Sequence, residues 1–170
     1  MLISDPARDN ALMKGMTIMS EEYTKNFMNE GGEVLLFNID ETLYGIEIKY
    51  INEIISIEQI TVVPKVPEYI KGVINLRGKV VPIISVRRRF GKEEIPYDER
   101  TCIIVLEFDD GNQVGIIVDR VREVTNVKPD EICETPDCKN VNANRYIKNI
   151  IESGGEIKQL LNCEKLISDL

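Results

Sequence analysis

From residue 33 onward, apolar and polar residues alternate in short runs that are bounded by Gly, Pro, Asn and Asp. β-branched residues dominate these runs, and short strands with turn signals between them are typical of small barrels or sandwiches. The pattern therefore predicts an all-β fold with little helix. The expected strands cover residues 33–39, 43–48, 50–57, 72–76, 80–85, 101–108, 113–118, 120–127, 146–151 and 156–161.

The expected hairpin over residues 72–85 carries an arginine at its tip. Arg77 and Gly78 form the turn, and Gly78 supplies the backbone freedom that a tight turn needs. Pro82 removes one ladder donor, so its strand is expected to lie at a sheet edge or to leave the sheet there. A short basic segment, residues 86–90, follows and ends at Gly91.

Three segments fall outside the strand pattern. Residues 1–32 hold all five methionines, and we expect a mobile N-terminal tail there. A helix stays open as an alternative, because five residues of the tail fall at helical spacings: Leu12, Met16, Met19, Tyr23 and Phe27. Residues 128–145 form a polar loop, and Asn162 is expected to cap a last helical turn over residues 163–167.

The chain contains an internal repeat. Residues 44–57 align with residues 114–127 at an offset of 70, and residues 69–84 align with 146–161 at an offset of 77. Gly45 matches Gly115 and Glu53 matches Glu123, whereas Arg77 has Gly154 as its counterpart. The repeat predicts two copies of one five-stranded unit, each too small for a large core of its own, packed as a pair.

Composition excludes several classes of function. The net charge is −8, from 29 acidic and 21 basic residues, which argues against nucleic acid and anionic membranes as main partners. No run of 18 apolar residues exists, so no membrane span is expected. The sequence has no histidine, and it therefore lacks the commonest general base and metal ligand.

The four cysteines are interpreted as free thiols of a cytoplasmic protein. A zinc site would require all four of them, because no histidine can complete a smaller set. We therefore predict no catalytic residues, no cofactor and no metal site.

The arginines allow several interpretations. Arg77 is a solvated turn residue, a fixed cationic tip presented to a partner, or the partner of a carboxylate such as Glu53, which a planar guanidinium can hold bidentately. The run Arg87–Arg89 is interpreted as the solvated face of a short helical turn. A nucleic-acid stripe would need interleaved aromatic residues, and these make up only 6% of the chain.

The residues Asn75–Gly78, Pro82 and Phe90–Gly91 belong to the pattern NLRG-x-x-x-P-I-I-x-x-R-x-x-F-G, which closely resembles the signature of the CheW family of bacterial chemotaxis coupling proteins. The segments YGIEI, NEI and YIKGV upstream, and VGIIVD and LLNCEKLI downstream, fit the same family. The resemblance covers about residues 33–168.

The resemblance implies two SH3-like five-stranded β-barrel lobes packed about a shared core, with short helical turns. We expect a tail over residues 1–32 and a CheW-like domain over 33–170, with lobe 1 at about 33–95 and lobe 2 at about 100–170. A return of the C-terminal segment to lobe 1 stays open.

The resemblance also implies function. It predicts a non-catalytic cytoplasmic adaptor that joins the cytoplasmic tips of methyl-accepting chemoreceptors to the regulatory domain of the histidine kinase CheA, without nucleic acid and without direct membrane insertion. Two alternatives stay open beside it: a small β-barrel module that binds nucleic acid, and a cysteine-based metal or redox protein.

The family motif assigns expected roles to individual positions. Ile51 and Glu53 are expected on a strand that lines partner surfaces, Gly72 near the kinase contact, and Arg77 in the receptor-coupling region. Val124 is expected to face an apolar groove between the lobes, where the receptor tip would lie. The complete expected partner-binding set is Ile51, Glu53, Gly72, Asn75, Leu76, Arg77, Gly78 and Val124.

Overall fold

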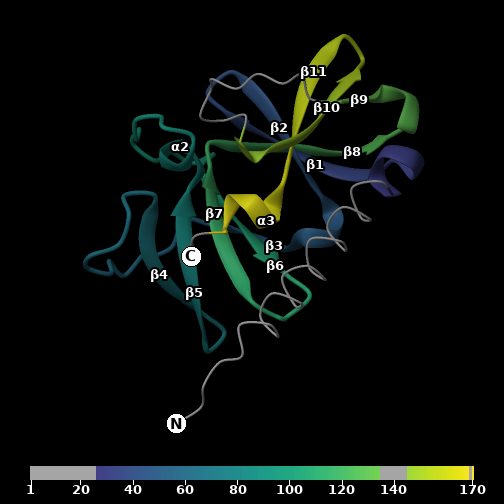
Figure 1. Cartoon of the computed structure of the whole chain (residues 1–170). Helices are drawn as coiled ribbons and strands as arrows, with labels where there is room; N and C mark the ends of the chain where they lie inside the picture. Colours follow the sequence, from purple (N-terminus) through teal and green to yellow (C-terminus); the bar gives the residue numbers. More distant parts are fainter. Residues whose placement is uncertain (1–25, 135–144, 169) are drawn as a thin grey trace.

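The structure is a computed structural model that describes residues 26–134, 145–168 and 170. Its strands form two sheets that lie in different parts of the molecule (Figure 1). The all-β prediction is confirmed, and the expected strands are present with their ends shifted by at most two residues.

One sheet has six strands in the order β8 (Arg120–Val127), β1 (Gly32–Ile39), β2 (Thr42–Glu47), β11 (Glu156–Leu161), β10 (Ile147–Ser153) and β9 (Ile132–Glu134). The other has five, in the order β3 (Ile51–Ser56), β6 (Cys102–Glu107), β7 (Gln113–Val118), β5 (Lys79–Ser85) and β4 (Ile70–Leu76). The short helices of the domain are η1 (Ile48–Tyr50), α2 (Val86–Arg89), η2 (Pro129–Glu131) and α3 (Cys163–Leu166).

The lobes exchange strands between the two copies of the repeat. At the repeat offsets, β1–β5 correspond to β6, β7, β8, β10 and β11. The five-stranded sheet takes β6 and β7 from the second copy and β3, β4 and β5 from the first, and the six-stranded sheet takes β1 and β2 from the first copy and β8, β10 and β11 from the second, with β9 added at its edge. The lobe boundary expected near residues 95–100 therefore does not separate the two sheets. Residues 51–118 supply the whole five-stranded sheet, and the segments on either side supply the six-stranded sheet.

Two short connections cause this exchange. Between β2 and β3 lies only η1, and between β7 and β8 lies only Asp119. At each connection the chain passes into the other sheet instead of pairing back on itself, as strands do where they switch sheets at a corner.

Strand registers repeat with the sequence. Gly45 of β2 pairs with Leu160 of β11, and Gly115 of β7 pairs with Ile83 of β5, both in parallel. The glycines permit close packing, because a Cβ at Gly45 would lie 2.5 Å from Val34 Cγ1 and one at Gly115 would lie 2.4 Å from Ile83 Cδ1. The predicted duplication is thus a duplication of structure.

The caps of the two short α-helices repeat as well. The Ser85 hydroxyl accepts a hydrogen bond from the Arg88 amide at 3.3 Å, and the Asn162 side chain accepts one from the Lys165 amide at 3.0 Å. The predicted role of Asn162 as a cap is confirmed.

The position of strand β5 in the sheet shows how Pro82 is accommodated. It lies between β7 and β4, so it is not an edge strand, but its pairing with β7 begins only at Ile83. The proline therefore stands where the strand diverges from β7, and no ladder bond to β7 is lost.

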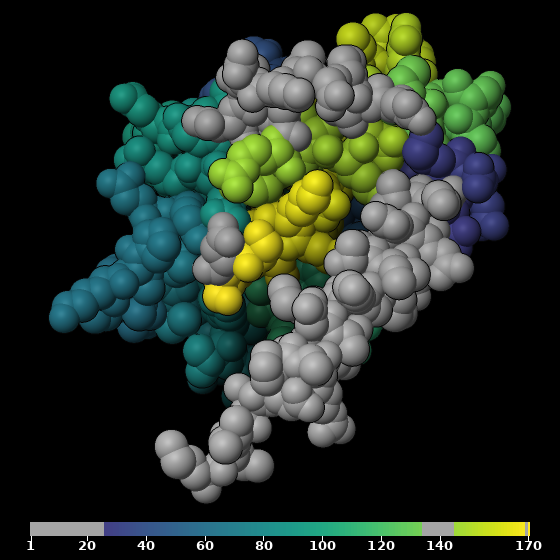
Figure 2. Space-filling view, viewed as in Figure 1, coloured from purple at the N-terminus to yellow at the C-terminus, as the bar shows by residue number. Residues whose placement is uncertain are grey.

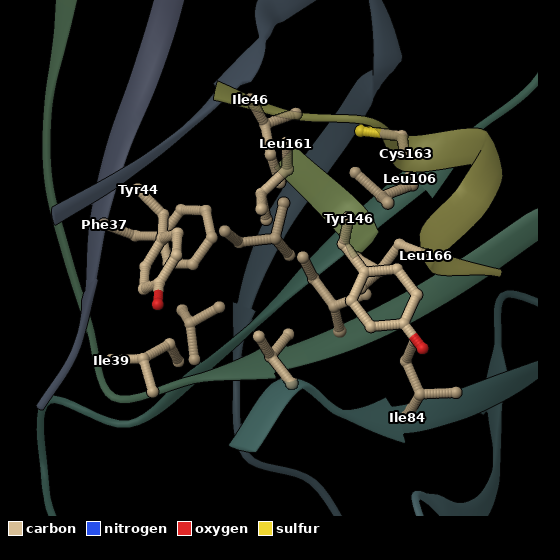
Figure 3. Packing of buried hydrophobic residues seen from close by; sticks show 14 of the residues in the cluster. Phe37, Ile39, Tyr44, Ile46, Ile84, Leu106, Tyr146, Leu161, Cys163 and Leu166 are labelled. Carbon is tan, nitrogen blue, oxygen red and sulfur yellow. The ribbon is translucent and has the colours of Figure 1, made fainter. Parts of the chain in front are cut away.

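Three apolar clusters form the core. One lies within each sheet, and the third, largest cluster is shared by both (Figure 3). Its centre contains Phe37, Tyr44, Ile84, Leu106 and Leu166, which come from both sheets and from α3. Figure 2 shows the α3 segment, in yellow, between the teal and the yellow-green parts of the chain. The lobes are therefore joined by a common hydrophobic core.

The interpretation of Arg87–Arg89 as a solvated face is wrong. Arg87 and Arg89 are buried, with 8% and 9% of their surface exposed, and only Arg88 faces solvent. The Arg89 guanidinium lies 4.2 Å from the Tyr69 ring centroid and 5.0 Å from that of Tyr146, and its Nε donates to the Leu166 carbonyl at 3.0 Å. Aromatic faces stabilise such a cation inside the protein.

Two expected segments are only partly described. Of the expected N-terminal tail, residues 1–25 lie outside the described residues, and with them Leu12, Met16, Met19 and Tyr23. Residues 26–30 are helical, and Phe27 is buried against the six-stranded sheet. Of the expected loop over 128–145, residues 135–144 lie outside the described part; its beginning forms η2 and β9, a strand that the sequence analysis missed.

Candidate functional site

The tip of the β4–β5 hairpin carries the central residues of the expected site. Arg77 and Gly78 both have positive φ, 52° and 83°, which is the geometry of a two-residue type I′ turn. The Asn75 side chain accepts a hydrogen bond from the Gly78 amide at 3.0 Å and so fixes the turn. Leu76 points the other way and is buried in the core of the five-stranded sheet.

Arg77 is strained by this turn, whereas its counterpart is not. At the equivalent hairpin of the other copy, Gly154 and Gly155 have φ values of 62° and 75°. Glycine adopts this region freely, but a residue with a side chain costs about 1–2 kcal/mol there. The turn itself therefore does not call for an arginine, and the side chain of Arg77 must be explained by what it contacts.

Arg77 contacts Glu53 of β3. Its Nη2 donates to Glu53 Oε2 at 2.6 Å, although the arginine side chain is 74% exposed. Strand β3 and the β4–β5 hairpin lie at opposite ends of the sheet order, so the contact shows that the five-stranded sheet is rolled up. Of the interpretations left open for Arg77, the pairing with the Glu53 carboxylate is present, and the guanidinium still faces solvent.

Glu53 has hydrogen-bonding capacity left over. Its side chain is 20% exposed, and within the described residues its Oε1 is buried without a hydrogen-bond partner. A buried acceptor without a donor is costly. The pair therefore presents a guanidinium whose four remaining N–H donors are mostly solvated.

Gly72 is needed by the backbone. Its φ is 140°, and a Cβ there would lie 2.1 Å from the Thr61 carbonyl oxygen. Thr61 and Val73 exchange two backbone hydrogen bonds of 2.9 Å, which hold the segment after β3 against β4. Gly72 itself is buried, so it positions this segment and offers no contact surface of its own.

The other two expected residues lie elsewhere. Ile51 is half-buried and packs against the shared core, and a β-bulge separates its register from that of Glu53. Val124 is 51% exposed on β8, at the edge of the six-stranded sheet. The structure thus brings Glu53, Asn75, Arg77 and Gly78 together and leaves Val124 on the other lobe.

Exposed apolar residues accompany both groups, and the sequence analysis missed all of them except Val124 as site residues. Ile54 and Val80 are 44% and 71% exposed beside Glu53 and the hairpin, and Val124 and Ile157 are 51% and 63% exposed at the equivalent positions of the other copy. Strand alternation places Ile54 on the outer face and was the available signal. Exposed apolar side chains next to a charged rim are typical of protein-binding surfaces.

An ionic cluster holds the lobes together at the β7–β8 connection. The Arg87 Nη1 lies 2.7 Å from Asp40 Oδ1 and 2.7 Å from Asp119 Oδ2, and Arg87 Nε donates to the Glu93 carbonyl at 2.8 Å. Lys92 Nζ also bonds Asp40, at 3.0 Å. The hydrogen bonds from Arg87 and Lys92 lower the pKa of Asp40 below its ordinary value.

The cysteines described by the structure do not gather at a site. Cys102 is half-buried, Cys133 exposed and Cys163 buried, and Cys138 lies outside the described residues. Burial raises the pKa of the Cys102 and Cys163 thiols, which disfavours the reactive thiolate form. Within residues 26–134, 145–168 and 170, no group of three or more acidic or cysteine side chains is arranged to hold a metal ion.

A helix able to cross a membrane is likewise missing from the part of the chain that the structure describes.

Comparisons with known proteins agree with this architecture. A family model described as "CheW-like domain" matches residues 33–170. The chemotaxis protein CheW of Klebsiella aerogenes is 38% identical over 138 residues, which cover 81% of this chain and 82% of that protein. The chemotaxis protein CheW of Thermotoga maritima is 32% identical over 142 residues, covering 81% and 89%.

A solved structure is similar as well. The crystal structure of the scaffolding protein TtCheW from Thermoanaerobacter tengcongensis matches with a TM-score of 0.74 at 30% sequence identity, and the match covers 79% of this chain and 91% of that one. The two lobes described above are SH3-like β-barrels of the kind that this neighbour has.

Proposed function

The chain belongs to the CheW-like domain family, and from this premise we propose that it is a non-catalytic adaptor that couples chemoreceptors to the histidine kinase CheA in bacterial chemotaxis signalling. The match to residues 33–170 carries the proposal, because it spans both sheets and the shared core. The relatives named above are chemotaxis proteins, and the solved neighbour is described as a scaffolding protein.

The partners of the proposed adaptor are the cytoplasmic tip of methyl-accepting chemoreceptors and the regulatory domain of CheA, and the protein acts in the cytoplasm. Two macromolecules must be held at once by separate surfaces. The two lobes offer such surfaces, since each carries exposed apolar residues at equivalent positions. Several modest contacts of this kind add up when the partners are themselves arranged in arrays.

Receptor coupling is assigned to the Arg77–Glu53 pair. A strained, solvated arginine that a carboxylate holds at 2.6 Å is a preorganised donor fork. Asn75 and Gly78 fix the turn, Leu76 anchors it in the core, and Ile51 seats strand β3. Gly72 supports the kinase contact through the segment at Thr61, and Val124 contributes from the second lobe.

Reconstitution of the chain with receptors and CheA tests the proposal. The chain should raise receptor-coupled kinase activity. Arg77→Ala should remove most of that gain while leaving the fold intact by circular dichroism. Lys79→Ala is the matched control, because it removes one exposed positive charge two residues along the same hairpin. A chain that folds but gives no gain in receptor-coupled kinase activity would contradict the proposed function.

The nucleic-acid alternative is not favoured. The net charge is −8, and two of the three consecutive arginines are buried and partnered within the protein. The segment Arg87–Arg89 therefore does not present a basic stripe with interleaved aromatic residues.

A further inference from the structure

The helical residues 26–30 end at a fixed point on the six-stranded lobe. The Gly31 amide donates to the Phe27 carbonyl at 2.8 Å, and Gly31 has a φ of 68°, as where a helix ends in a left-handed glycine. A Cβ at Gly31 would lie 2.1 Å from the Val127 carbonyl oxygen, so the end of the helix is held closely against β8. A single helical turn is marginal on its own, which favours a helix that begins before residue 26.

The sequence before residue 26 carries an apolar stripe that continues to Phe27. Its members are Leu12, Met16, Met19 and Tyr23, at spacings of three and four residues. Phe27 is the member that the structure describes, and it is 5% exposed in the apolar cluster of the six-stranded lobe. Because residues at these spacings share one helix face, a helix that extends upstream turns the whole stripe to the side on which Phe27 is buried.

A seam between the lobes leads away from Phe27. The Phe27 ring lies 5.7 Å from Lys148 Nζ, and Lys148 lines a small cavity together with Tyr50 of η1 and Glu164 of α3. The Tyr50 ring lies 5.8 Å from the ring of Phe108, which follows β6 of the five-stranded sheet. Both rings are half-buried. The seam, defined as Lys148, Glu164, Tyr50 and Phe108, therefore runs from one lobe to the other.

The opposite side of the lobe junction is closed by an arginine, and the seam is not. On that opposite side, Arg87 of α2 donates to Asp119 at 2.7 Å. At the repeat offsets the counterparts of Arg87 and Asp119 are Glu164 and Lys49, so the charges are reversed. Lys49 Nζ lies 3.4 Å from Glu47 Oε2 of β2, and Glu164 lines the cavity. The contact that closes one side of the junction is thus not repeated at the seam.

We propose that the seam is the docking surface of the chain's own residues 12–27, which form one helix with residues 26–30 and lie across the junction as a strap, with the apolar stripe against Tyr50 and Phe108. The strap joins the lobes on the side away from Arg87. Burial of the stripe stabilises the helix and the junction together. The inference does not depend on the proposed function.

Length and polarity fit this occupant. A helix from Leu12 to Phe27 is about 22 Å long, several times the separations of 5.7 and 5.8 Å between successive groups of the seam. The helix face opposite the stripe carries Lys14, Glu21 and Lys25, whose side chains suit solvent.

The methionines give a direct test. All five lie in residues 1–32, so methionine labelled with ¹³C in its methyl group reports on this segment alone. In the labelled full-length chain, we expect NOEs from the Met16 and Met19 methyl groups to the ring protons of Tyr50 and Phe108. Methyl signals of Met16 and Met19 without an NOE to either ring would overturn the proposal.

Two neighbouring residues supply matched variants. Met19 belongs to the stripe, whereas Ile18 lies on the other side of the helix, because successive residues are about 100° apart. Met19→Asp should abolish the NOEs from Met16 to both rings and should speed hydrogen exchange of the Tyr50 amide. Ile18→Asp and the conservative Met19→Leu should keep both signals as in the wild type. Equal effects of Met19→Asp and Ile18→Asp would contradict docking through the stripe.

A mixture of labelled and unlabelled chains identifies the occupant. If the strap lies on its own chain, the NOEs connect methyl groups and rings of the same molecule and do not change on dilution. NOEs from labelled methyl groups to the rings of unlabelled chains would show that a second copy fills the seam, and would overturn the proposal. Neither receptor nor kinase is present in these samples, so the strap and the proposed function can fail separately.

Discussion

Removing the charge of Arg87 should be costly for the stability of this protein. It joins three parts of the chain: α2, which carries it, the β1–β2 turn through Asp40, and the β7–β8 connection through Asp119. Its side chain is 10% exposed. Replacing it by methionine keeps most of the aliphatic stem and removes only the charged fork.

The geometry sets the size of the effect. Removing one partner of a buried ion pair costs about 3–5 kcal/mol, because the other charge is left without compensation. Asp119 is 18% exposed and would be left in that state, but Asp40 is 43% exposed and keeps Lys92 at 3.0 Å. The lower end applies, so Arg87→Met should cost about 3 kcal/mol, or about 6–12 °C in Tm for a chain of this size.

The neighbouring arginine supplies the control. Arg88 is 37% exposed, and its contacts with Glu68 and Glu94 are 3.8 and 4.0 Å long, so Arg88→Met should cost less than about 1 kcal/mol. Urea unfolding followed by circular dichroism measures both. Equal stabilities of the two variants would refute the reasoning, since it places all of the difference in burial and ion-pair geometry.

The same variant should change the acid response. The pKa of Asp40 is lowered in the folded state, chiefly by its hydrogen bond with Arg87. A lowered carboxyl pKa stabilises the folded state above the ordinary value of 3.8, and this contribution is lost as the pH falls below it. The stability difference between wild type and Arg87→Met should therefore be full at pH 6 and shrink below about pH 4. A difference that stays constant to pH 3 would show that Asp40 does not depend on Arg87.

Three further predictions concern the turn, the glycine and the strand exchange. Arg77→Gly should change the free energy of unfolding by less than about 1 kcal/mol, because relief of the positive φ offsets the loss of the exposed ion pair. The same variant should lose receptor-coupled kinase activity. A large loss of stability in urea unfolding would show that the arginine is structural. Gly72→Ala should lower the free energy of unfolding by about 3 kcal/mol, because the added Cβ would clash with Thr61. Gly154→Ala, which also has a positive φ but has open space around it, should lower it by only about 1 kcal/mol. Equal losses of stability would show that the clash is not the cause. A fragment of residues 33–100 should be unfolded by circular dichroism, since each of its sheets lacks strands, and a folded fragment would contradict the exchange between copies.

The strands and the duplication could be predicted from the sequence because their causes are local. Alternation of apolar and polar residues sets the strands, and Gly and Asn residues set the turns. The offset of 70 that aligns Gly45 with Gly115 reappears as equivalent strand pairs, and the offset of 77 reappears at the caps Ser85 and Asn162. A repeated pattern folds into a repeated unit when both copies meet the same packing demands.

The exchange of strands could not be predicted, because the pattern is the same whichever copy a strand pairs with. What decides it is the path of the chain at η1 and at Asp119, where the connection is too short for the chain to return and it continues into the other sheet. The burial of Arg87 and Arg89 escaped prediction for a similar reason. Their partners, Asp119 and Tyr146 among them, are distant in sequence, and a short basic run carries no sign of them.

Comparing the two copies separates what the fold requires from what it merely tolerates. Tyr69 and Tyr146 are identical in both copies and flank Arg89 together, so the fold accounts for them. Arg77 and Gly154 share one backbone conformation but differ in side chain, and the strained member is the one that reaches solvent. Because the second copy folds with glycine at this position, the barrel does not require the arginine, and the side chain of Arg77 is explained by what it contacts and not by the turn.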